Sequence, residues 1–465
     1  MDERAYSRPI DVHRLSEYPE VQRVISFLLT ELKDSSLLGK SPGKKILKHL
    51  KAVVLDLYVG YLSDPYLYIG YPRAKSQYSR ESRLGKLFFG YRPMMRVVDG
   101  LETLGYLESH KGFQDLSTGR SRQSRMRATS RLIDLINNYA VVPSMVSREE
   151  ENVLLLRDED GNDIPYPETE ASTKMRDKLT SYNAFLEQHE IALSLPVEEV
   201  RELLISRQSP PIDYTRKRLC RIFSGDFKSG GRFYKGWWQE MPSELRPHIT
   251  IDGEAASELD YGGQHLLLLY ALKDHEYRWL RGPDDPYEIK SVKNIDRDLM
   301  KQVFLTCVNA ESKEKAVLSI RSEINKNYKN LKSTNEVINA LIDATIENHP
   351  ELSDSFFTGA WAELQYQDSL IADYVLGHMQ ARGQVALPVH DSFVVQDQHL
   401  AQLFATMKEA YRMLGIDSIP DVEFKKGANT TFDKPYFMEF WREIDEDRER
   451  NEKELQALKD LEDHV

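Results

Sequence analysis

Several features are absent from this sequence of 465 residues, and each absence excludes a class of protein. It has only two cysteines, Cys220 and Cys307, too few for a disulfide framework or a four-ligand zinc site. The longest apolar run, Leu266 to Leu272, is far shorter than the roughly 18 residues of a membrane-spanning helix. No apolar signal-peptide core follows the charged start, and no glycine-rich Walker loop marks an ATPase. We therefore expect a soluble, cytoplasmic protein with no membrane partner.

The charge of the chain is unevenly distributed. The net charge is −12, from 62 basic and 74 acidic residues, which by itself argues against a nucleic-acid partner. Residues 71–132, however, contain 13 Lys and Arg against 5 Asp and Glu. With this local excess of 8 positive charges, the basic and acidic surfaces of the chain have to be interpreted separately.

The N-terminal part has the element order of a known DNA-binding fold. Residues 1–40 are expected to form a polar arm with one short helix. Apolar spacing predicts helices over 21–32, 44–62 and 79–89, and one from Pro93 to a stop at Gly105. Two strand-like segments follow, YLESHKGF and RSRQSRMRAT. Three helices and a basic two-stranded ribbon resemble the winged-helix domains of replication initiators and repressors, here over residues 41–146.

This resemblance implies a function for the arginines of the segment. Arg92 and Arg96 would enter a major groove on the third helix. The ribbon arginines would reach the flanking phosphates, namely Arg120, Arg122, Arg125 and Arg127. Two alternatives remain open: a solvated basic face on an ordinary helical domain, and a winged fold used as a protein–protein adaptor.

The rest of the chain divides by composition. An acidic linker opens the segment 147–212, which then continues with thumb-like helices near 172–188 and 197–206. Residues 213–435 contain the segments that indicate chemistry, and 436–465 read as a highly charged helix. The expected fold class is α+β.

Four motifs stand in order between 213 and 435. Arg232 lies in GGRFYKGWWQ, and a short strand ends at Asp260 before Tyr261. A helix has Arg297 and Lys301 one turn apart, and a hairpin-like strand pair has His390 and Asp391 at its tip. This arrangement resembles the palm and fingers of family-A DNA polymerases and phage-type single-subunit RNA polymerases.

The resemblance implies an antiparallel palm sheet with helical fingers and assigns roles to these residues. Two Mg²⁺ ions, with Mn²⁺ able to substitute, would be held by Asp260, Asp391 and the main-chain carbonyl of Tyr261. Lys301 and Arg297 would neutralise the triphosphate. The remaining positions would contact substrate: Arg232 on the template–primer duplex, Leu305 at the nascent base pair, and His390 beside the metal site.

Two departures from the family pattern affect sugar selection. His265 stands where the DNA polymerases have a Glu that excludes the ribose 2′-hydroxyl, and Asn309 stands in place of the fingers tyrosine. DNA and RNA synthesis therefore both remain open. Taken singly, Asp260 could also be a helix cap and Asp391 a turn residue.

The favoured function is a DNA-directed DNA polymerase of a mobile element or plasmid, which uses a DNA template–primer duplex and nucleoside triphosphates. Whether it also primes is left open. The first alternative is a small single-subunit RNA polymerase or primase, which the His-Asp-Ser-Phe sequence and the missing Glu favour. The second is a non-catalytic winged-helix initiator or regulator with a degenerate palm.

Overall fold

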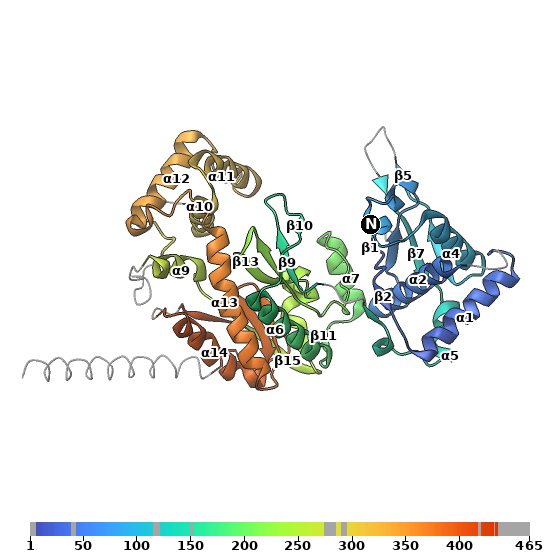
Figure 1. Cartoon of the computed structure of the whole chain (residues 1–465). Coiled ribbons are helices and arrows are strands. Elements are labelled where there is room, and N and C mark those ends of the chain that lie inside the picture. Colours follow the sequence, from blue (N-terminus) through green and yellow to red (C-terminus); the bar gives the residue numbers. More distant parts are fainter. Residues whose placement is uncertain are drawn as a thin grey trace, which may run out of the picture. The chain divides into compact units, whose positions relative to one another are not determined.

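The chain folds into two compact units of mixed helix and strand (Figure 1). The N-terminal unit contains residues 1–151, 195–216 and 240–242, and the C-terminal unit contains 152–194, 217–239 and 243–465. The structure, a computed structural model, describes residues 6–38, 43–114, 121–148, 152–273, 285–289, 295–416, 420–431 and 433–435. Helices coexist with mainly antiparallel sheets, which confirms the α+β class.

The N-terminal unit is built on helices that bury apolar faces. They are α1 (Pro19–Asp34), α2 (Lys44–Ser63), α3 (Arg83–Lys86), α4 (Tyr91–Thr103), α5 (Ser130–Asn138) and α7 (Val197–Ser206). The helix expected over 79–89 is instead the 3₁₀ turn η2 (Lys75–Tyr78) and the short α3. Gly85 lies so close to the Ser79 carbonyl that a Cβ would not fit. The chain therefore turns sharply there and does not continue as one helix.

A four-stranded sheet completes this unit. Its strands in order are β1 (Ser7–Pro9), β3 (Tyr68–Tyr71), β7 (Ser124–Ala128) and β4 (Leu107–His110). β1 is parallel to β3, and the other neighbours are antiparallel. Two small pairs flank the sheet: β5 (Phe113–Gln114) with β6 (Ser121–Arg122), and β2 (Arg14–Leu15) with β8 (Ser147–Arg148). The two strand-like segments do form strands, β4 and β7, but these are neighbours within the four-stranded sheet and not a separate two-stranded ribbon.

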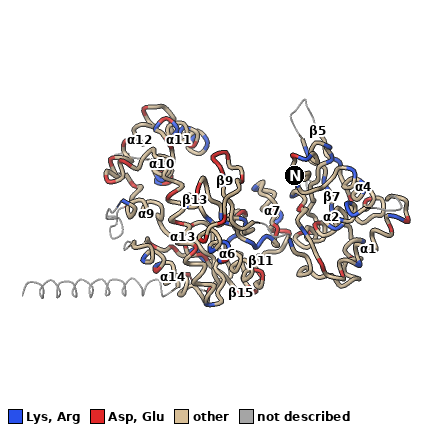
Figure 2. Tube along the Cα trace, in the orientation of Figure 1, with Lys and Arg blue, Asp and Glu red and all other residues tan. Residues whose placement is uncertain are grey.

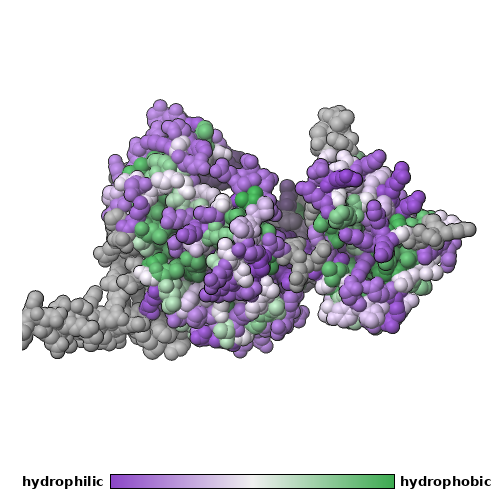
Figure 3. Space-filling view, viewed as in Figure 1, coloured by the Kyte–Doolittle hydropathy of each residue, from purple (hydrophilic) through white to green (hydrophobic). Residues whose placement is uncertain are grey.

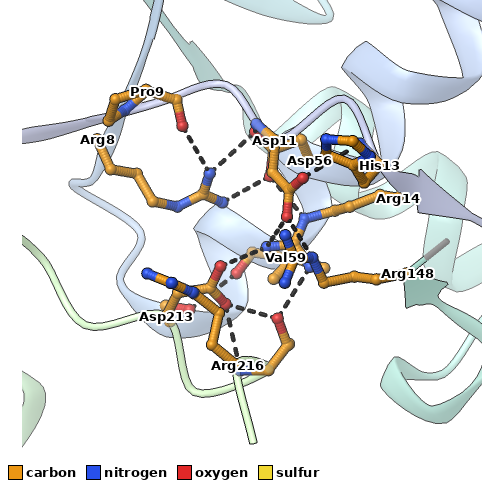
Figure 4. A network of polar contacts seen from close by, with 12 residues as sticks. Arg8, Pro9, Asp11, His13, Arg14, Asp56, Val59, Arg148, Asp213 and Arg216 are labelled. Carbon is orange, nitrogen blue, oxygen red and sulfur yellow. Dashed lines mark hydrogen bonds and ion pairs between the residues drawn. The ribbon is translucent and has the colours of Figure 1, made fainter. Parts of the chain in front are cut away.

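A buried network of ion pairs holds the segment from Arg8 to Arg14 in place (Figure 4). Asp56, fully buried on α2, accepts from Arg8 at 2.9 and 2.7 Å and from Arg14 Nε at 2.6 Å. Arg14 also donates to Asp213 at 2.7 Å, and Arg148 pairs with Asp11 at 2.8 Å. Buried charges are tolerated only when they are paired in this way. Residues 6–38 are therefore integral to this unit and do not form a separate arm.

The segment expected as an acidic linker enters the core of the C-terminal unit. β9 (Leu154–Arg157) pairs in parallel with β12 (Cys220–Ser224), and Leu154, Leu156 and Phe223 form a hydrophobic cluster. The sheet is completed by β10 (Asp163–Ile164) and β13 (Asp226–Tyr234). The predicted thumb-like helices separate: α6 (Glu170–Glu187) belongs to this unit, and α7 belongs to the other. The segment 147–212 is therefore divided between the two units and does not form one region.

A second sheet forms the centre of the C-terminal unit. Its order is β11 (Ile191–Leu193), β14 (Ile249–Ile251), β15 (Glu254–Tyr261), β17 (Ser392–Gln396) and β16 (Ala386–Val389), with β18 (Val422–Lys425) also on β15. All these pairings are antiparallel. The helices α13 (Trp361–Gln380) and α14 (Leu400–Met413) contact its strands and each other. Burial on both faces explains why β16 and β17 are almost wholly apolar.

The other helices of this unit lie between β15 and the β16–β17 hairpin in sequence. They are α9 (Gln264–Leu272), α10 (Arg297–Asn309), α11 (Lys313–Asn327) and α12 (Asn335–Asn348). α10, α11 and α12 contact one another and form a group at one end of the unit (Figure 1). Phe304 of α10 packs against His349 and Phe356, with ring centroids 5.0 and 5.9 Å apart. Short helical turns complete the chain: η3 (Pro143–Met145), α8 (Trp237–Glu240), η4 (Ser243–His248), η5 (Pro350–Leu352) and η6 (Asp397–His399).

Hydrophilic residues cover most of the viewed face of both units, with smaller hydrophobic patches among them (Figure 3). Cys220 and Cys307 are both buried, and neither forms a disulfide bond. None of the helices in the described ranges combines the length and the apolar character needed to cross a membrane. The charged helix predicted for 436–465 lies outside the described residues.

Candidate active site

Two strands of the central sheet bring Asp260 and Asp391 together. Asp260, near the end of β15, is paired with Ser392 at the start of β17. The Tyr261 amide donates to the carbonyl oxygen of Asp391 at 3.2 Å. His390 and Asp391 form the turn between β16 and β17, with His390 in the left-handed conformation at φ 59°. Residues far apart in sequence thus become neighbours on one edge of the site.

The sequence left a second role open for each aspartate, a helix cap for Asp260 and a turn residue for Asp391, and only one of these roles is observed. Asp260 does not cap the following helix, because α9 begins after Gly263, whose φ of 68° makes the turn from β15. Asp391 is indeed a hairpin-turn residue. Asp391 is also partly exposed, and its charge acts on Asp260, so the turn assignment and a chemical role are compatible.

Asp260 is electrostatically unusual. Burial and the neighbouring Asp391 raise the pKa of Asp260 to about 6, against the opposing effect of Lys425. Oδ2 of Asp260 lies 2.5 Å from the Lys425 ammonium. Its other oxygen, Oδ1, is buried and has no hydrogen-bond partner among the described residues. A buried carboxylate oxygen without a donor is costly, which favours a cation at this position.

The oxygen donors at this point fit a hard divalent cation. Two carboxylates and the main-chain carbonyl of Tyr261 are the ligand types that Mg²⁺ takes from proteins. No group of three or more His, Cys, Asp or Glu side chains within the described ranges is placed to hold a metal. The remaining coordination positions would therefore have to come from water and from substrate phosphates, as is usual for Mg²⁺.

Lys425 and Glu258 lie beside the carboxylate pair. The Lys425 ammonium contacts Glu258 at 3.0 Å as well as Asp260. Glu258 also accepts from Arg246, at 3.2 Å. Although burial acts to raise it, these two cations hold the pKa of Glu258 below its usual range. Glu258 is therefore a neutralised structural carboxylate and not a free ligand.

Behind the pair lies a buried polar network around Arg232. Arg232 contacts Asp368 of α13, and Gln264 Nε2 donates to the other Asp368 oxygen at 2.9 Å. Asp368 is only 2% exposed, and burial raises its pKa to about 6 despite the opposing effect of Arg232. The network fixes the guanidinium of Arg232 and the first turn of α9.

Arg232 in turn fixes His265. The guanidinium Nη2 lies 2.7 Å from His265 Nε2. Because guanidinium can only donate, Nε2 must be the acceptor, and the neutral ring carries its hydrogen on Nδ1. Burial and the positive charge of Arg232 lower the pKa of His265 to about 4. His265 is therefore a neutral, oriented imidazole at neutral pH.

A glycine pair makes the approach of Arg232 possible. Gly230 and Gly231 both have positive φ, 75° and 85°, at an irregularity of the β12–β13 pairing. A Cβ on Gly231 would lie 2.5 Å from the Phe223 ring. The fully buried Arg221 donates to the Gly231 carbonyl at 2.8 Å and to Ser369 of α13 at 2.9 Å. The glycines let β13 bend and direct Arg232 toward α13.

The α10 residues are placed differently from one another. Arg297 is half-exposed and pairs with Asp285 at 2.5 Å, with its guanidinium 5.5 Å from the Tyr287 ring centre. Lys301 is exposed, and its charge contributes to the lowered pKa of His265. Leu305 is partly buried and Asn309 is exposed. Of this helix, Lys301 is thus the cation with an electrostatic link to the site.

His390 is a neutral neighbour of the carboxylates. Burial lowers its pKa, and the Arg232 charge adds to that effect. Its ring lies edge-on to Tyr234, with centroids 6.1 Å apart. These contacts agree with a residue that shapes the turn beside Asp391.

The predicted DNA-binding arginines of the N-terminal unit fall into three groups. Arg92 and Arg96 are exposed, one turn apart on α4. Arg125 and Arg127 lie on β7, where Arg125 is only 6% exposed and Arg127 pairs with Glu108 at 2.6 Å. Arg122 is partly buried on β6, and Arg120 lies outside the described residues.

Sequence reasoning missed Asp368 and Lys425. Asp368 could have been found, because it interrupts an apolar stripe of α13 formed by Leu364, Ile371 and Val375. An acid on such a stripe predicts a buried, paired charge. Lys425 has no such signal, since it lies on a short strand of alternating exposed residues. Only the pairing of β18 with β15 brings it to Asp260.

Comparison with known proteins adds no assignment. No protein-family model matches the sequence, and no curated protein is significantly similar to it. A function for this chain therefore has to be inferred from the geometry of the site and from the motifs.

Proposed function

We propose that the chain is a template-directed nucleic-acid polymerase whose C-terminal unit is a palm with helical fingers. The observation that carries the proposal is the pairing of Asp260 with Asp391 across β15 and the β16–β17 hairpin, with a buried Asp260 oxygen lacking a donor. A strand that ends in Asp beside a His-Asp hairpin is also the arrangement that the sequence resemblance implies.

The residues present suit nucleotidyl transfer with two Mg²⁺ ions. When bound, such ions would activate a primer 3′-hydroxyl and neutralise a triphosphate. Asp260, Asp391 and the Tyr261 carbonyl would hold them. Lys301 would add positive charge beside the phosphates, and Arg232, fixed by Asp368, would lie against the template–primer duplex.

The N-terminal unit would bind duplex DNA. Its α2, α3 and α4 followed by β4 and β7 have the order of three helices and a ribbon that a winged helix has. The exposed Arg92 and Arg96 on α4 support groove entry and phosphate contact. A polymerase fused to such a unit suits a replication enzyme of a mobile element or plasmid.

One observation favours RNA synthesis or priming as the second candidate. The position of the sugar-excluding Glu is taken by His265, which Arg232 holds neutral. A neutral imidazole offers a hydrogen bond to a 2′-hydroxyl without excluding it. Ribonucleotides would then be accepted alongside deoxynucleotides.

A primer-extension assay tests the proposal. Purified full-length protein is given Mg²⁺ and a primed DNA template, or the template alone, with deoxynucleotides and ribonucleotides in separate reactions. Asp260→Asn and Asp391→Asn should each abolish incorporation. Asp252→Asn, which changes a carboxylate in the turn between β14 and β15, should retain it. Full activity in either site variant would refute the two-carboxylate site. Absence of incorporation by the wild type, with DNA binding retained, would favour a non-catalytic initiator.

A further inference from the structure

Phe88 has two unfavourable properties at once. Its side chain is 79% exposed, the largest exposure among the large hydrophobic residues that the structure describes. Its backbone has φ 61°, in the left-handed region that bulky residues rarely adopt. Neither property contributes to folding, so the folded structure by itself does not explain an aromatic residue at this position.

The backbone around Phe88 is a standard helix ending. At the end of α3 the Phe88 amide donates to Gly85 O, and the Phe89 amide donates to Leu84 O, both at 2.9 Å. This pair of bonds requires one left-handed residue just beyond the helix, and glycine is favoured there because it has no Cβ.

Other helices of the chain show which residues this position usually takes. α1, α4, α5, α7, α13 and α14 end with the same pair of backbone hydrogen bonds. Their left-handed residues are Ser36, Gly105, Ala140, Gln208, Gly383 and Gly415. Three are glycine and three are small or polar, so an exposed phenylalanine stands apart within this chain itself.

The neighbouring Phe89 does not share this exposure. Phe89 is 3% exposed and packs against His49, with ring centroids 4.6 Å apart. The Lys48 ammonium lies 5.1 Å from the Phe89 ring centre and donates to the Leu87 carbonyl at 3.0 Å. Phe89 therefore anchors the loop, and this anchoring holds Phe88 outward.

The surroundings of Phe88 are strongly basic. Residues 73–96 contain seven Lys and Arg and one acid, Glu81. α4 begins three residues after Phe88 and presents Arg92 and Arg96 to solvent. Lys and Arg positions gather along this part of the N-terminal unit (Figure 2). An apolar ring within a positive surface suits a polyanion that also presents apolar groups, which duplex DNA does through its base edges and thymine methyls.

We propose that Phe88 is a DNA-contacting residue that packs against a base edge or thymine methyl at the N-terminal end of α4. The proposal rests on the proposed DNA-binding role of the N-terminal unit and deepens it. Arg92 and Arg96 supply salt-dependent affinity, and Phe88 supplies an apolar contact that depends on sequence and not on salt.

The test is the substitution Phe88→Gly in the full-length protein. Glycine suits the left-handed backbone, so the variant should melt about 2–4 °C higher than the wild type. Loss of the apolar contact should weaken DNA binding about tenfold. The slope of log affinity against log salt should stay unchanged, because no charge is removed. The probe is a duplex of about 30 base pairs, roughly three helical turns, selected by the wild type from a random pool.

Two comparisons isolate the effect. Ala140→Gly removes the strain of a side chain at the equivalent left-handed position at the end of α5. It should raise the melting temperature without changing the affinity for DNA. Arg92→Gln with Arg96→Gln should reduce the magnitude of the salt slope by about 2, because two phosphate contacts are lost. Phe88→Asn, which also accepts a left-handed backbone, should repeat the loss of affinity.

Each outcome is decisive. Unchanged affinity of Phe88→Gly at a raised melting temperature would overturn the proposal for Phe88 and leave DNA binding standing. A lowered melting temperature would overturn it too, because Phe88 would then be a packing residue. Failure of the wild type to select any duplex would instead refute the DNA-binding role of the N-terminal unit.

Discussion

Asp260→Asn should stabilise the metal-free protein at neutral pH while it abolishes activity. Burial and Asp391 raise the pKa of Asp260 from 3.8 to about 6, so the folded state opposes ionisation of this carboxyl. The difference corresponds to about 3 kcal/mol of destabilisation at pH 7.5. An amide resembles the protonated acid, and the carboxyl is partly exposed at 19%. We therefore expect the variant to be more stable by about 1–3 kcal/mol.

The pH dependence follows from the direction of this pKa change. A raised carboxyl pKa contributes stability that is fully present below pH 3.8 and is lost as the pH rises through about 6. The stability gap between variant and wild type should therefore be largest at pH 7.5 and shrink as the pH falls toward 4. Only the difference between the two proteins is compared, because other carboxyls titrate in both.

Tryptophan fluorescence during urea unfolding measures the relevant unit. The tryptophans in the described ranges, Trp237, Trp238 and Trp361, belong to the C-terminal unit, and the residues of the N-terminal unit include no tryptophan. Tryptophan emission therefore reports the unfolding of the unit that contains Asp260. Adding Mg²⁺ should stabilise the wild type by mass action and leave Asp260→Asn unchanged.

Asp252→Asn is a control of opposite sign. Although burial acts to raise it, hydrogen bonds from His189 and the Glu190 amide hold the pKa of Asp252 below its usual range. Asp252 is 40% exposed, so its loss should destabilise the protein by less than about 1 kcal/mol. A destabilised Asp260→Asn, or a gap that does not change with pH, would refute the electrostatic description of the site.

Three further predictions concern other parts of the chain. Asp56→Ala leaves the buried Arg8 and Arg14 without their shared carboxylate and should destabilise the N-terminal unit by about 3–5 kcal/mol, measured by amide hydrogen exchange. Amide protection equal to that of the wild type would contradict the role of the network. His265→Glu should lower ribonucleotide incorporation relative to deoxynucleotide incorporation; equal ratios in both proteins would place the sugar gate elsewhere. Lys301→Ala should weaken nucleotide binding and catalysis about tenfold or more, and a loss limited to template affinity would contradict its proposed position beside the triphosphate.

Local patterns in the sequence were sufficient for most helices and for the strand order near the site. The periodic apolar residues of α2 and α4 and the stop at Gly105 predict those helices well, because a helix needs only its own residues to form its hydrogen bonds. Asp260 and Asp391 could be nominated together because each lies at the end of a strand-like segment in a specific motif. The segment around Leu154 was misread, because its acidic neighbours resemble a linker and its strand partner, β12, is distant in sequence.

The amino-acid sequence by itself identified the candidate carboxylates, the acidic and basic regions, and the helices with periodic apolar residues. Their electrostatic states were decided by tertiary structure, since a pKa depends on burial and on neighbours in space. Lys425 reaches Asp260 only because β18 pairs with β15, and Asp368 reaches Arg232 only because α13 contacts β13. Likewise, seven basic residues over 73–96 indicate a polyanion partner from sequence alone. Only the structure distinguishes Phe88, with its left-handed backbone and exposed side chain, from the buried Phe89 beside it.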